Sequence, residues 1–402
     1  MTSEAVVWTW LPGAVAPVPA GRLRATQGGL AFAYARSYLD RADAISLYGP
    51  ELPLRSGPIE PLPGLAMPSC LRDGSPDAWG RRVIATRMTG NPDDDSLTEV
   101  DLMLLSGSNR IGANDFQARP DAYVARSDTA PVADLLDAAE RLDAGERLPA
   151  EIAAALVHGT SVGGARPKIL LRDNGVEFLA KLSSSTDRYP VVKAEAAAMA
   201  LARMAGIDAA ETSLRRISGR DALLVRRFDR VEGARRHVVS GLTLLGLEEM
   251  AGRYATYPDL VAVLTEGGDD AAAKVFERIA AYIALGNFDD HARNHAAFWD
   301  GRGLTLTPAY DICPQPRSGE TAYQAMAYGL DGQRAAELPA LVRAAPAYGL
   351  TIADARSRVD RIVDAVESGW ADAADEAKLS AAERDRLWRR LILNPASVRG
   401  LR

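Results

Sequence analysis

The sequence predicts an α+β protein with two lobes, in which a β-rich subdomain comes first and a mostly α-helical lobe completes the chain. Short β-prone runs at residues 6–10 and 30–34 are separated by turns rich in Pro and Gly. Residues 159–230 alternate apolar strands with one helix-forming run, and helical periodicity dominates after residue 240. A chain of 402 residues is too long for a single compact core. We therefore expect three segments: 1–110, 111–232 and 233–402.

Helices are expected between the first β-prone runs and residue 110. Ser75 precedes Pro76, an order typical of a helix start, with Ser as the cap and Pro at the first helical position. A second helix is expected around residues 101–105. In the run 132–142 the leucines recur at helical spacing, which predicts a solvated helix that links two units.

The middle of the chain predicts a β-hairpin, a helix and a second β-hairpin. Strands at 168–172 and 177–182 flank an Asp-Asn-Gly turn, and Asn-Gly between apolar runs is a strong hairpin signal. The alanine-rich run 193–205 predicts a helix, and Gly206 is expected to end it. Strands are expected at 211–217 and 221–230, separated by another Gly turn.

The last third of the chain is expected to be almost all helical. Residues 272–285 form an amphipathic run with Val275, Ile279, Tyr282 and Ile283 on one face. Later amphipathic runs at 353–367 and 381–393 predict helices that pack the same lobe.

Composition excludes several classes of protein. The net charge is 47 − 53 = −6, so the whole chain is not a basic nucleic-acid binder. Two distant cysteines offer no disulfide framework, which fits a reducing cytoplasm. The N-terminus lacks the basic and apolar regions of a signal peptide, and no run approaches the roughly 18 apolar residues of a membrane helix. We expect a cytoplasmic protein that does not enter a membrane.

Three polar residues near position 300 are spaced for phosphoryl transfer. Asn294 follows Asp289 by five residues, and Asp311 comes after a short hairpin-like segment. This chemistry needs a carboxylate to accept the substrate hydroxyl proton, and an amide oxygen and a second carboxylate to hold magnesium against the phosphates. The D-x-x-x-x-N spacing matches the catalytic loop of protein kinases, although the H-R-D prefix and the D-F-G sequence are absent.

Two other interpretations of this stretch stay open at this point. Asp and Asn that lie close together commonly cap helices or build turns. His291 and His295 are spaced i, i+4, which on a helix would place both rings on one face, as in zinc sites. Asp289, Asp290 and Asp311 could then complete a metallohydrolase site. The choice depends on whether a nucleotide-binding half exists upstream.

Residues 159–230 supply the parts of such a half. The stretch 159–168 is a Gly-rich turn that runs into a strand, and the hairpin–helix–hairpin order is that of the small lobe of a protein kinase. Lys181, at the end of the second strand, is placed to reach phosphates, and Glu195 on the next helix could hold it by an ion pair. The backbone of Arg226, Arg227 and Phe228 could bond the adenine.

These residues resemble the HipA family of serine/threonine kinases, the toxins of bacterial type II toxin–antitoxin modules. The resemblance covers nearly the whole chain and implies a protein-kinase-like two-lobed fold. Its most specific stretches are residues 161–168, 224–230, 287–294 and 306–311, with 45–47 and 75–82 resembling the N-terminal subdomain of the family.

The resemblance implies a role for each matching residue. Asp289 is the catalytic base, Asn294 and Asp311 are magnesium ligands, and Lys181 binds the phosphates of ATP. Ser161 is the autophosphorylated serine, and its phosphate would repel the phosphates of ATP and shut the enzyme down. The remaining residues expected at the nucleotide are Gly163, Gly164, Ala165, Arg166, Pro167, Lys168, Arg226, Arg227, Phe228, His291, Arg293 and Tyr310.

Two positions depart from the family pattern. Pro167 in the phosphate loop lacks a backbone N–H that could hold phosphate. Arg293 stands where Lys is usual, which keeps the charge and changes the donor geometry.

The resemblance also implies partners. These are a helix-turn-helix antitoxin dimer (HipB-like), operator DNA contacted mainly through that antitoxin, and a protein substrate of the aminoacyl-tRNA synthetase class. A second hypothesis is a catalytically weak kinase fold that acts as a co-repressor with the antitoxin. The intact Asp289, Asn294, Asp311 and Lys181 argue against it, because a pseudokinase is expected to lose at least one of them.

Overall fold

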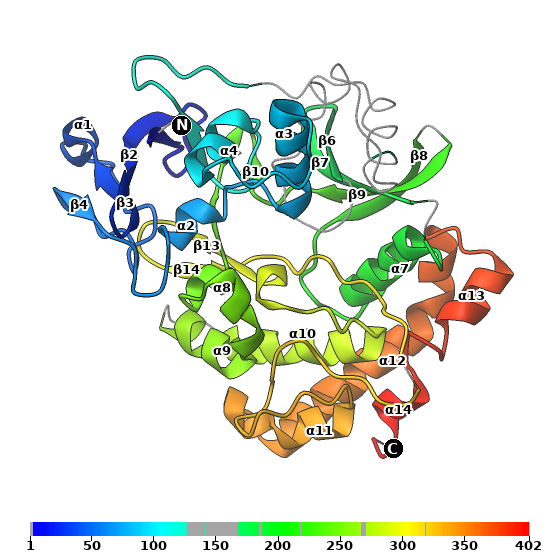
Figure 1. Ribbon diagram of the computed structural model, residues 1–402. Coiled ribbons are helices and arrows are strands. Elements are labelled where there is room, and N and C mark those ends of the chain that lie inside the picture. Colours follow the sequence, from blue (N-terminus) through cyan, green and yellow to red (C-terminus); the bar gives the residue numbers. More distant parts are fainter. Residues whose placement is uncertain are drawn as a thin grey trace. The chain divides into compact units, whose positions relative to one another are not determined.

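The computed structural model describes residues 3–126, 141, 168–184, 187–217, 219–266, 271–317 and 319–401. The chain divides into two compact units (Figure 1). Unit 1 comprises Met1–Leu182, Arg227–Val239 and Phe298–Gly303, and unit 2 comprises Ser183–Arg226, Ser240–Ala297 and Leu304–Arg402. Both units mix helices and strands, so the predicted α+β class is confirmed. The three consecutive segments stay a prediction.

Unit 1 is built on an antiparallel sheet of five strands in the order β4-β3-β2-β1-β5 (Figure 1). The strands are β1 (Glu4–Thr9), β2 (Val18–Thr26), β3 (Gly29–Tyr34), β4 (Pro58–Ile59) and β5 (Asn114–Gln117). Leu23 is fully buried between exposed Arg22 and Arg24, the period-two alternation of a sheet with one solvated face. The β-prone runs at 6–10 and 30–34 therefore predicted two of these strands.

Four helices accompany this sheet: α1 (Arg36–Leu39), α2 (Ser69–Arg72), α3 (Ala78–Thr89) and α4 (Glu99–Leu105). The predicted cap of α3 is wrong. Asp77, not Ser75, accepts a bond from the Gly80 amide at 2.7 Å, and the Ser75 hydroxyl instead donates to Glu99. The helix expected around 101–105 starts earlier, at a capping box between Thr98 and Asp101.

The first predicted hairpin is present in unit 1. Strands β6 (Lys168–Asp173) and β7 (Val176–Leu182) pair antiparallel. Asn174 and Gly175 join them with φ of 48° and 82°, the left-handed conformations that a two-residue turn between right-twisted strands requires. Three short strands follow residues 226–228, the predicted adenine-binding hinge: β10 (Arg230–Val231), β11 (Ala234–Arg235) and β12 (His237–Ser240).

Unit 2 is organised around three helices, α7 (Val191–Met204), α10 (Ala271–Leu285) and α12 (Ile352–Glu376), which pack against one another (Figure 1). The predicted apolar face of α10 is buried throughout, from Val275 to Ile283. Full burial of each such side chain contributes about 1.5–3 kcal/mol. Gly206 ends α7 as predicted, with its amide bonded to the Arg203 carbonyl. The second hairpin is β8 (Thr212–Ile217) and β9 (Arg220–Arg226).

The expectation that nearly everything after residue 240 is helical is wrong between residues 287 and 337. That stretch contains the short η3 (Ala292–Asn294), strands β13 (Ala296–Trp299) and β14 (Leu304–Leu306), and irregular chain. The helix expected at 353–367 is longer, and the one expected at 381–393 ends at Leu387. The remaining elements are α8 (Gly241–Leu244), η2 (Glu249–Tyr254), α9 (Tyr257–Thr265), α11 (Leu338–Arg343), η4 (Ala345–Tyr348), α13 (Ala381–Leu387) and α14 (Pro395–Val398).

Two sequence-based predictions fall outside the described residues: nearly all of the linker helix at 132–142, and the Gly-rich turn up to residue 167. Within the described ranges, no helix is both long and apolar enough to cross a membrane.

Candidate functional site

The loop that carries Asp289 begins where α10 stops in unit 2. Gly286 turns the chain with φ of 74°, and a Cβ there would lie 2.4 Å from the Leu391 carbonyl oxygen. Only glycine fits this combination of a left-handed conformation and a close backbone. The chain then runs through Asp289 and Asp290 into η3, so the end of a buried helix fixes the start of the loop.

Asn294 closes the loop back onto Asp289. Its side-chain Nδ2 donates to the Asp289 carbonyl oxygen at 2.7 Å, and the residue is buried. Because the side-chain amide donates its hydrogen bond through Nδ2, the Oδ1 atom is the one that can coordinate a cation. The five-residue spacing seen in the sequence thus corresponds to a direct contact.

Asp289 and Asp311 influence one another electrostatically. Asp289 is an exposed residue, yet partial burial of its carboxyl raises its pKa, His291 opposes that shift, and the negative charge of Asp311 raises it further. Asp311 has φ of 60°, a left-handed conformation that is uncommon for a residue other than glycine and is often found at functional sites. The structure therefore brings together Asp289, Asn294, Asp311 and His291.

Asp290, next to Asp289, is wholly buried and receives three hydrogen bonds. The Tyr257 hydroxyl and Gln324 Nε2 donate to Oδ2, the latter at 2.9 Å, and the Ala325 amide donates to Oδ1 at 2.9 Å. Burial raises the pKa of Asp290 to about 6, although these three bonds oppose the shift. The contacts cross 33 to 35 residues of sequence, so no local pattern could have revealed them.

The zinc interpretation does not fit this geometry. His291 and His295 do not share an α-helix, because η3 is a single turn and His295 is extended. His295 is buried, packs edge-on against Tyr257 at 5.1 Å, and has its pKa lowered to about 3 by burial. In the described part of the chain, no three His, Cys, Asp or Glu side chains converge as a metal cluster.

Two further predicted residues lie in the same part of unit 2. Arg293 makes a bidentate ion pair with Glu249 of η2, with Nε 2.8 Å from Oε1. The Tyr310 hydroxyl donates to the Arg293 carbonyl oxygen at 2.7 Å. Both side chains therefore hold the loop in place, and the sequence offered no signal for Glu249.

The predicted phosphate-binding residues that the structure describes lie in unit 1. Lys168 and Lys181 are direct partners in the β6–β7 register, so both side chains emerge on one face, and both are buried. Two cations on one face are suited to an anionic ligand. Ser161 and Gly163, Gly164, Ala165, Arg166 and Pro167 lie outside the described residues. Glu195 is buried on α7.

The predicted hinge residues differ from one another. Arg226 ends β9, exposed, with its amide bonded to the Glu211 carbonyl oxygen at 2.8 Å. The Arg227 amide bonds to the Glu177 carbonyl oxygen at 2.9 Å. Both amide groups therefore already donate hydrogen bonds within the protein. An adenine at residues 226–228 would be recognised by other backbone atoms. Phe228 packs edge-on against Phe298 at 5.8 Å.

The Arg227 side chain belongs to a buried charge cluster in unit 1. Two of its nitrogens donate hydrogen bonds to the Asp229 carboxylate, at 2.9 and 2.7 Å. Arg230 and the Gly112 amide donate to the same carboxylate. Burial alone would raise the pKa of Asp229, but the two arginines hold it well below its usual range. This cluster fastens the segment after the hinge to the loop at Gly112.

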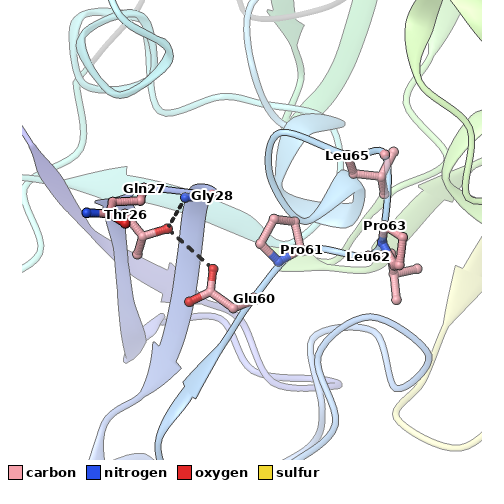
Figure 2. Close-up of a pocket in the computed structure, with 9 residues that line it drawn as sticks. Thr26, Gln27, Gly28, Glu60, Pro61, Leu62, Pro63 and Leu65 are labelled. Carbon is pink, nitrogen blue, oxygen red and sulfur yellow. Dashed lines mark hydrogen bonds between the residues drawn. The ribbon is translucent and has the colours of Figure 1, made fainter.

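Figure 2 shows a hollow elsewhere in unit 1, between the β2–β3 turn and the chain at residues 60–65. Thr26 Oγ1 donates to Glu60 Oε2 at 3.3 Å on its wall, and Pro61, Leu62 and Pro63 line the rest. It contains none of the predicted site residues.

Comparison with known proteins identifies the family. The model of the HipA-like C-terminal domain matches residues 160–370, which is 211 of 402 residues, and the model of the HipA N-terminal domain matches residues 14–117. The chain belongs to the HipA family. The predicted family is therefore confirmed, over both halves of the chain.

One curated relative is the serine/threonine-protein kinase toxin HipA of Shewanella oneidensis, 30% identical over 184 residues. The match spans 38% of this chain and 42% of that relative. The HipA chain in a solved complex of HipA, HipB and operator DNA from the same organism is similar over 96% of both chains, with 19% identity and a TM-score of 0.66. That likeness confirms the HipA fold.

The residues of the loop fit a magnesium ion. Mg²⁺ is usually bound by one or two carboxylates together with substrate phosphates and water, not by a complete protein cage. Asn294 Oδ1 and the Asp311 carboxylate supply oxygen donors of that kind, and a cluster of three acidic or histidine ligands is not required.

Proposed function

We propose that this HipA-family chain is an ATP- and Mg²⁺-dependent protein serine/threonine kinase that acts as the toxin of a type II toxin–antitoxin module. The observation that carries the proposal is the loop in which Asn294 bonds the Asp289 backbone, while burial, and to a lesser degree the charge of Asp311, raises the pKa of the Asp289 carboxyl. A base with two oxygen donors near it is the set of parts that phosphoryl transfer uses, and this supports the proposal.

Each residue has one task in the reaction. The oxygen of the acceptor hydroxyl attacks the γ-phosphorus of ATP, the bond from that phosphorus to the β–γ bridging oxygen breaks, and ADP leaves. Asp289 accepts the hydroxyl proton, and a pKa above the ordinary value makes it a stronger base. Asn294 and Asp311 would hold magnesium, which supplies positive charge to the phosphates when bound.

The remaining predicted roles belong to the same proposal. Lys168 and Lys181 bind phosphate, Glu195 orients Lys181, and the backbone around Phe228 binds the adenine. Autophosphorylation of Ser161 would switch the enzyme off by charge repulsion.

The proposed partners follow from the family. The related Shewanella structure holds HipA with HipB and operator DNA. We infer a helix-turn-helix antitoxin for this chain, with DNA contacted mainly through that antitoxin. The net charge of −6 agrees with DNA contacts that come mainly from the antitoxin, because an acidic chain is repelled by DNA phosphates. An aminoacyl-tRNA synthetase is the proposed class of substrate.

The test is incubation of the purified chain with radiolabelled ATP and magnesium, followed by mapping of any label. Asp289→Asn keeps the size of the side chain and removes the base, so its label should fall at least 100-fold. Asp385→Asn, at an exposed position on α13, is the matched control and should behave like the wild type.

One outcome would contradict the kinase, and another would contradict the role of Asp289. ATP binding without any incorporation would favour the co-repressor hypothesis. Equal incorporation by the wild type and Asp289→Asn would remove Asp289 from the role of base.

A further inference from the structure

Three large side chains of unit 2 are exposed near the loop of residues 286–294, which carries the proposed base and is called the catalytic loop below. Met250 and Tyr254 of η2 are 79% and 64% exposed, and Tyr323 is 63% exposed. Methionine is among the residue types most often buried, and tyrosine is usually at least partly buried, so exposure at all three positions is unusual. We call these three residues the exposed strip.

Both segments that carry the strip are fastened to the catalytic loop. Glu249, the neighbour of Met250, pairs with Arg293. Tyr257 and Gln324, which follow Tyr254 and Tyr323 in the chain, donate to the carboxylate of Asp290, the neighbour of the proposed base. The strip is therefore held in a fixed relation to Asp289.

The two segments are also tied to each other. Arg334 donates to the Ala325 carbonyl oxygen at 3.0 Å and to the Arg253 carbonyl oxygen at 3.1 Å, which joins the chain next to Tyr323 with the chain next to Tyr254. An isolated bridge pairs Thr256 with Ala327. The two segments that carry the strip therefore lie side by side, although they are about 70 positions apart in the chain.

Three charged residues lie around the strip, and one of them is paired with an opposite charge. Glu249 is neutralised by Arg293, and Arg253 lies over the Tyr254 ring at 4.8 Å and donates to its hydroxyl at 3.0 Å. Arg334 is used by the two backbone carbonyls. A partner that binds here meets apolar and aromatic side chains beside two arginines that are bonded to neutral groups, which suits a peptide segment with a large apolar or aromatic side chain.

We propose that the exposed strip binds the acceptor segment of the protein substrate, through a large apolar side chain close to the phosphorylated Ser or Thr. This inference rests on the proposed kinase function and adds a sequence preference to it. An acceptor segment must bring its hydroxyl to Asp289, and the strip is apolar and aromatic surface on segments that bond Asp290 and Arg293, which follow that base in the chain. Exposed Met and Tyr are the residue types enriched at protein interfaces.

The probe is an arrayed library of serine peptides in which each position flanking the serine is fixed in turn as Leu, Phe, Lys or Glu. The wild-type chain should prefer Leu or Phe at one or more flanking positions. Tyr254→Ser and Tyr323→Ser should each lower kcat/KM for the preferred peptide about tenfold. They should leave the affinity for ATP, measured separately, unchanged. Ile352→Ser, at a half-exposed apolar position at the start of α12, is the control and should match the wild type.

Four results would overturn the inference. If the wild type phosphorylates peptides without an apolar preference, or if both strip variants match the control, the strip is not the acceptor site and the kinase proposal stands. If the variants lose self-association or antitoxin binding while their peptide kinetics stay normal, the strip belongs to another interface. If the wild type transfers phosphate to no acceptor, itself included, the kinase proposal and the inference fail together.

Discussion

Replacing Asp290 by asparagine should change how the stability of the protein depends on pH. Asp290 is buried, and burial raises its pKa to about 6 from an ordinary value near 3.8. Asparagine keeps the size of the side chain and cannot titrate. The difference in the free energy of unfolding between the wild type and Asp290→Asn therefore isolates the ionisation of this one carboxyl.

The sign follows from proton binding. Between about pH 4 and pH 6 the folded wild type keeps the Asp290 proton, whereas the unfolded chain has lost it. The stability contributed by this group is thus full below pH 4 and is lost as the pH rises through 6. The total is about 3 kcal/mol, and between pH 5 and pH 8 the expected change is about 1.4 kcal/mol.

Two buried histidines titrate in the same range with the opposite sign. Burial lowers the pKa of His237 to about 4 and that of His295 to about 3, so they favour the folded state more as the pH rises toward 6.5. Both are present in the wild type and in the variant, so they cancel in the difference.

The assay is urea unfolding followed by tryptophan fluorescence at pH 5, 6, 7 and 8. The wild type should lose about 1.4 kcal/mol relative to Asp290→Asn across this range. The variant also loses hydrogen bonds to Tyr257, Gln324 and Ala325, which lowers its free energy of unfolding by an amount that does not depend on pH. If the free energies of unfolding of the wild type and Asp290→Asn differ by the same amount at every pH from 5 to 8, the pKa of Asp290 is not raised.

Two further substitutions test contacts that fix the segments around the site. Asp229→Asn should destabilise unit 1 by about 3–5 kcal/mol, because it leaves two buried arginines without their shared anion; chemical denaturation that shows a loss under 1 kcal/mol would contradict this. Gly241→Ala would place a Cβ 2.5 Å from the Ala292 carbonyl oxygen of η3, and should cost about 1–3 kcal/mol and reduce phosphate transfer. Gly303→Ala meets no atom within 4 Å and should show neither effect, so equal behaviour of the two glycine variants would refute the steric argument.

Local physics made several features predictable from the sequence. Runs of β-prone residues marked the strands at 6–10 and 30–34, the Asn-Gly pair marked the β6–β7 turn, and apolar spacing marked α10. The same holds for the candidate loop. Residues five positions apart can meet within one turn of chain, so the spacing of Asp289 and Asn294 was enough to predict that they lie close together. In the structure, Asn294 Nδ2 is 2.7 Å from the Asp289 carbonyl oxygen.

Where local signals competed, the sequence alone gave the wrong answer. Ser75 and Asp77 are both good helix caps, and only the pairing of Ser75 with Glu99 assigns the cap to Asp77. The i, i+4 histidines would share a face on an α-helix, but the loop makes a single 3₁₀ turn and buries His295 against aromatic rings.

Tertiary structure alone decided which charges are buried. The sequence was enough to establish an α+β chain of the HipA family and to point to Asp289, Asn294 and Asp311. It could not distinguish Asp290 from its exposed neighbour Asp289, or Arg227 from exposed Arg226, because each pair consists of identical adjacent residues. Tyr257 lies 33 residues from Asp290 along the chain, and Arg227 donates to the Asn109 side chain, 118 residues away, as well as to nearby Asp229. Burial and long-range pairing are properties of the folded chain, so they leave no mark on the local pattern.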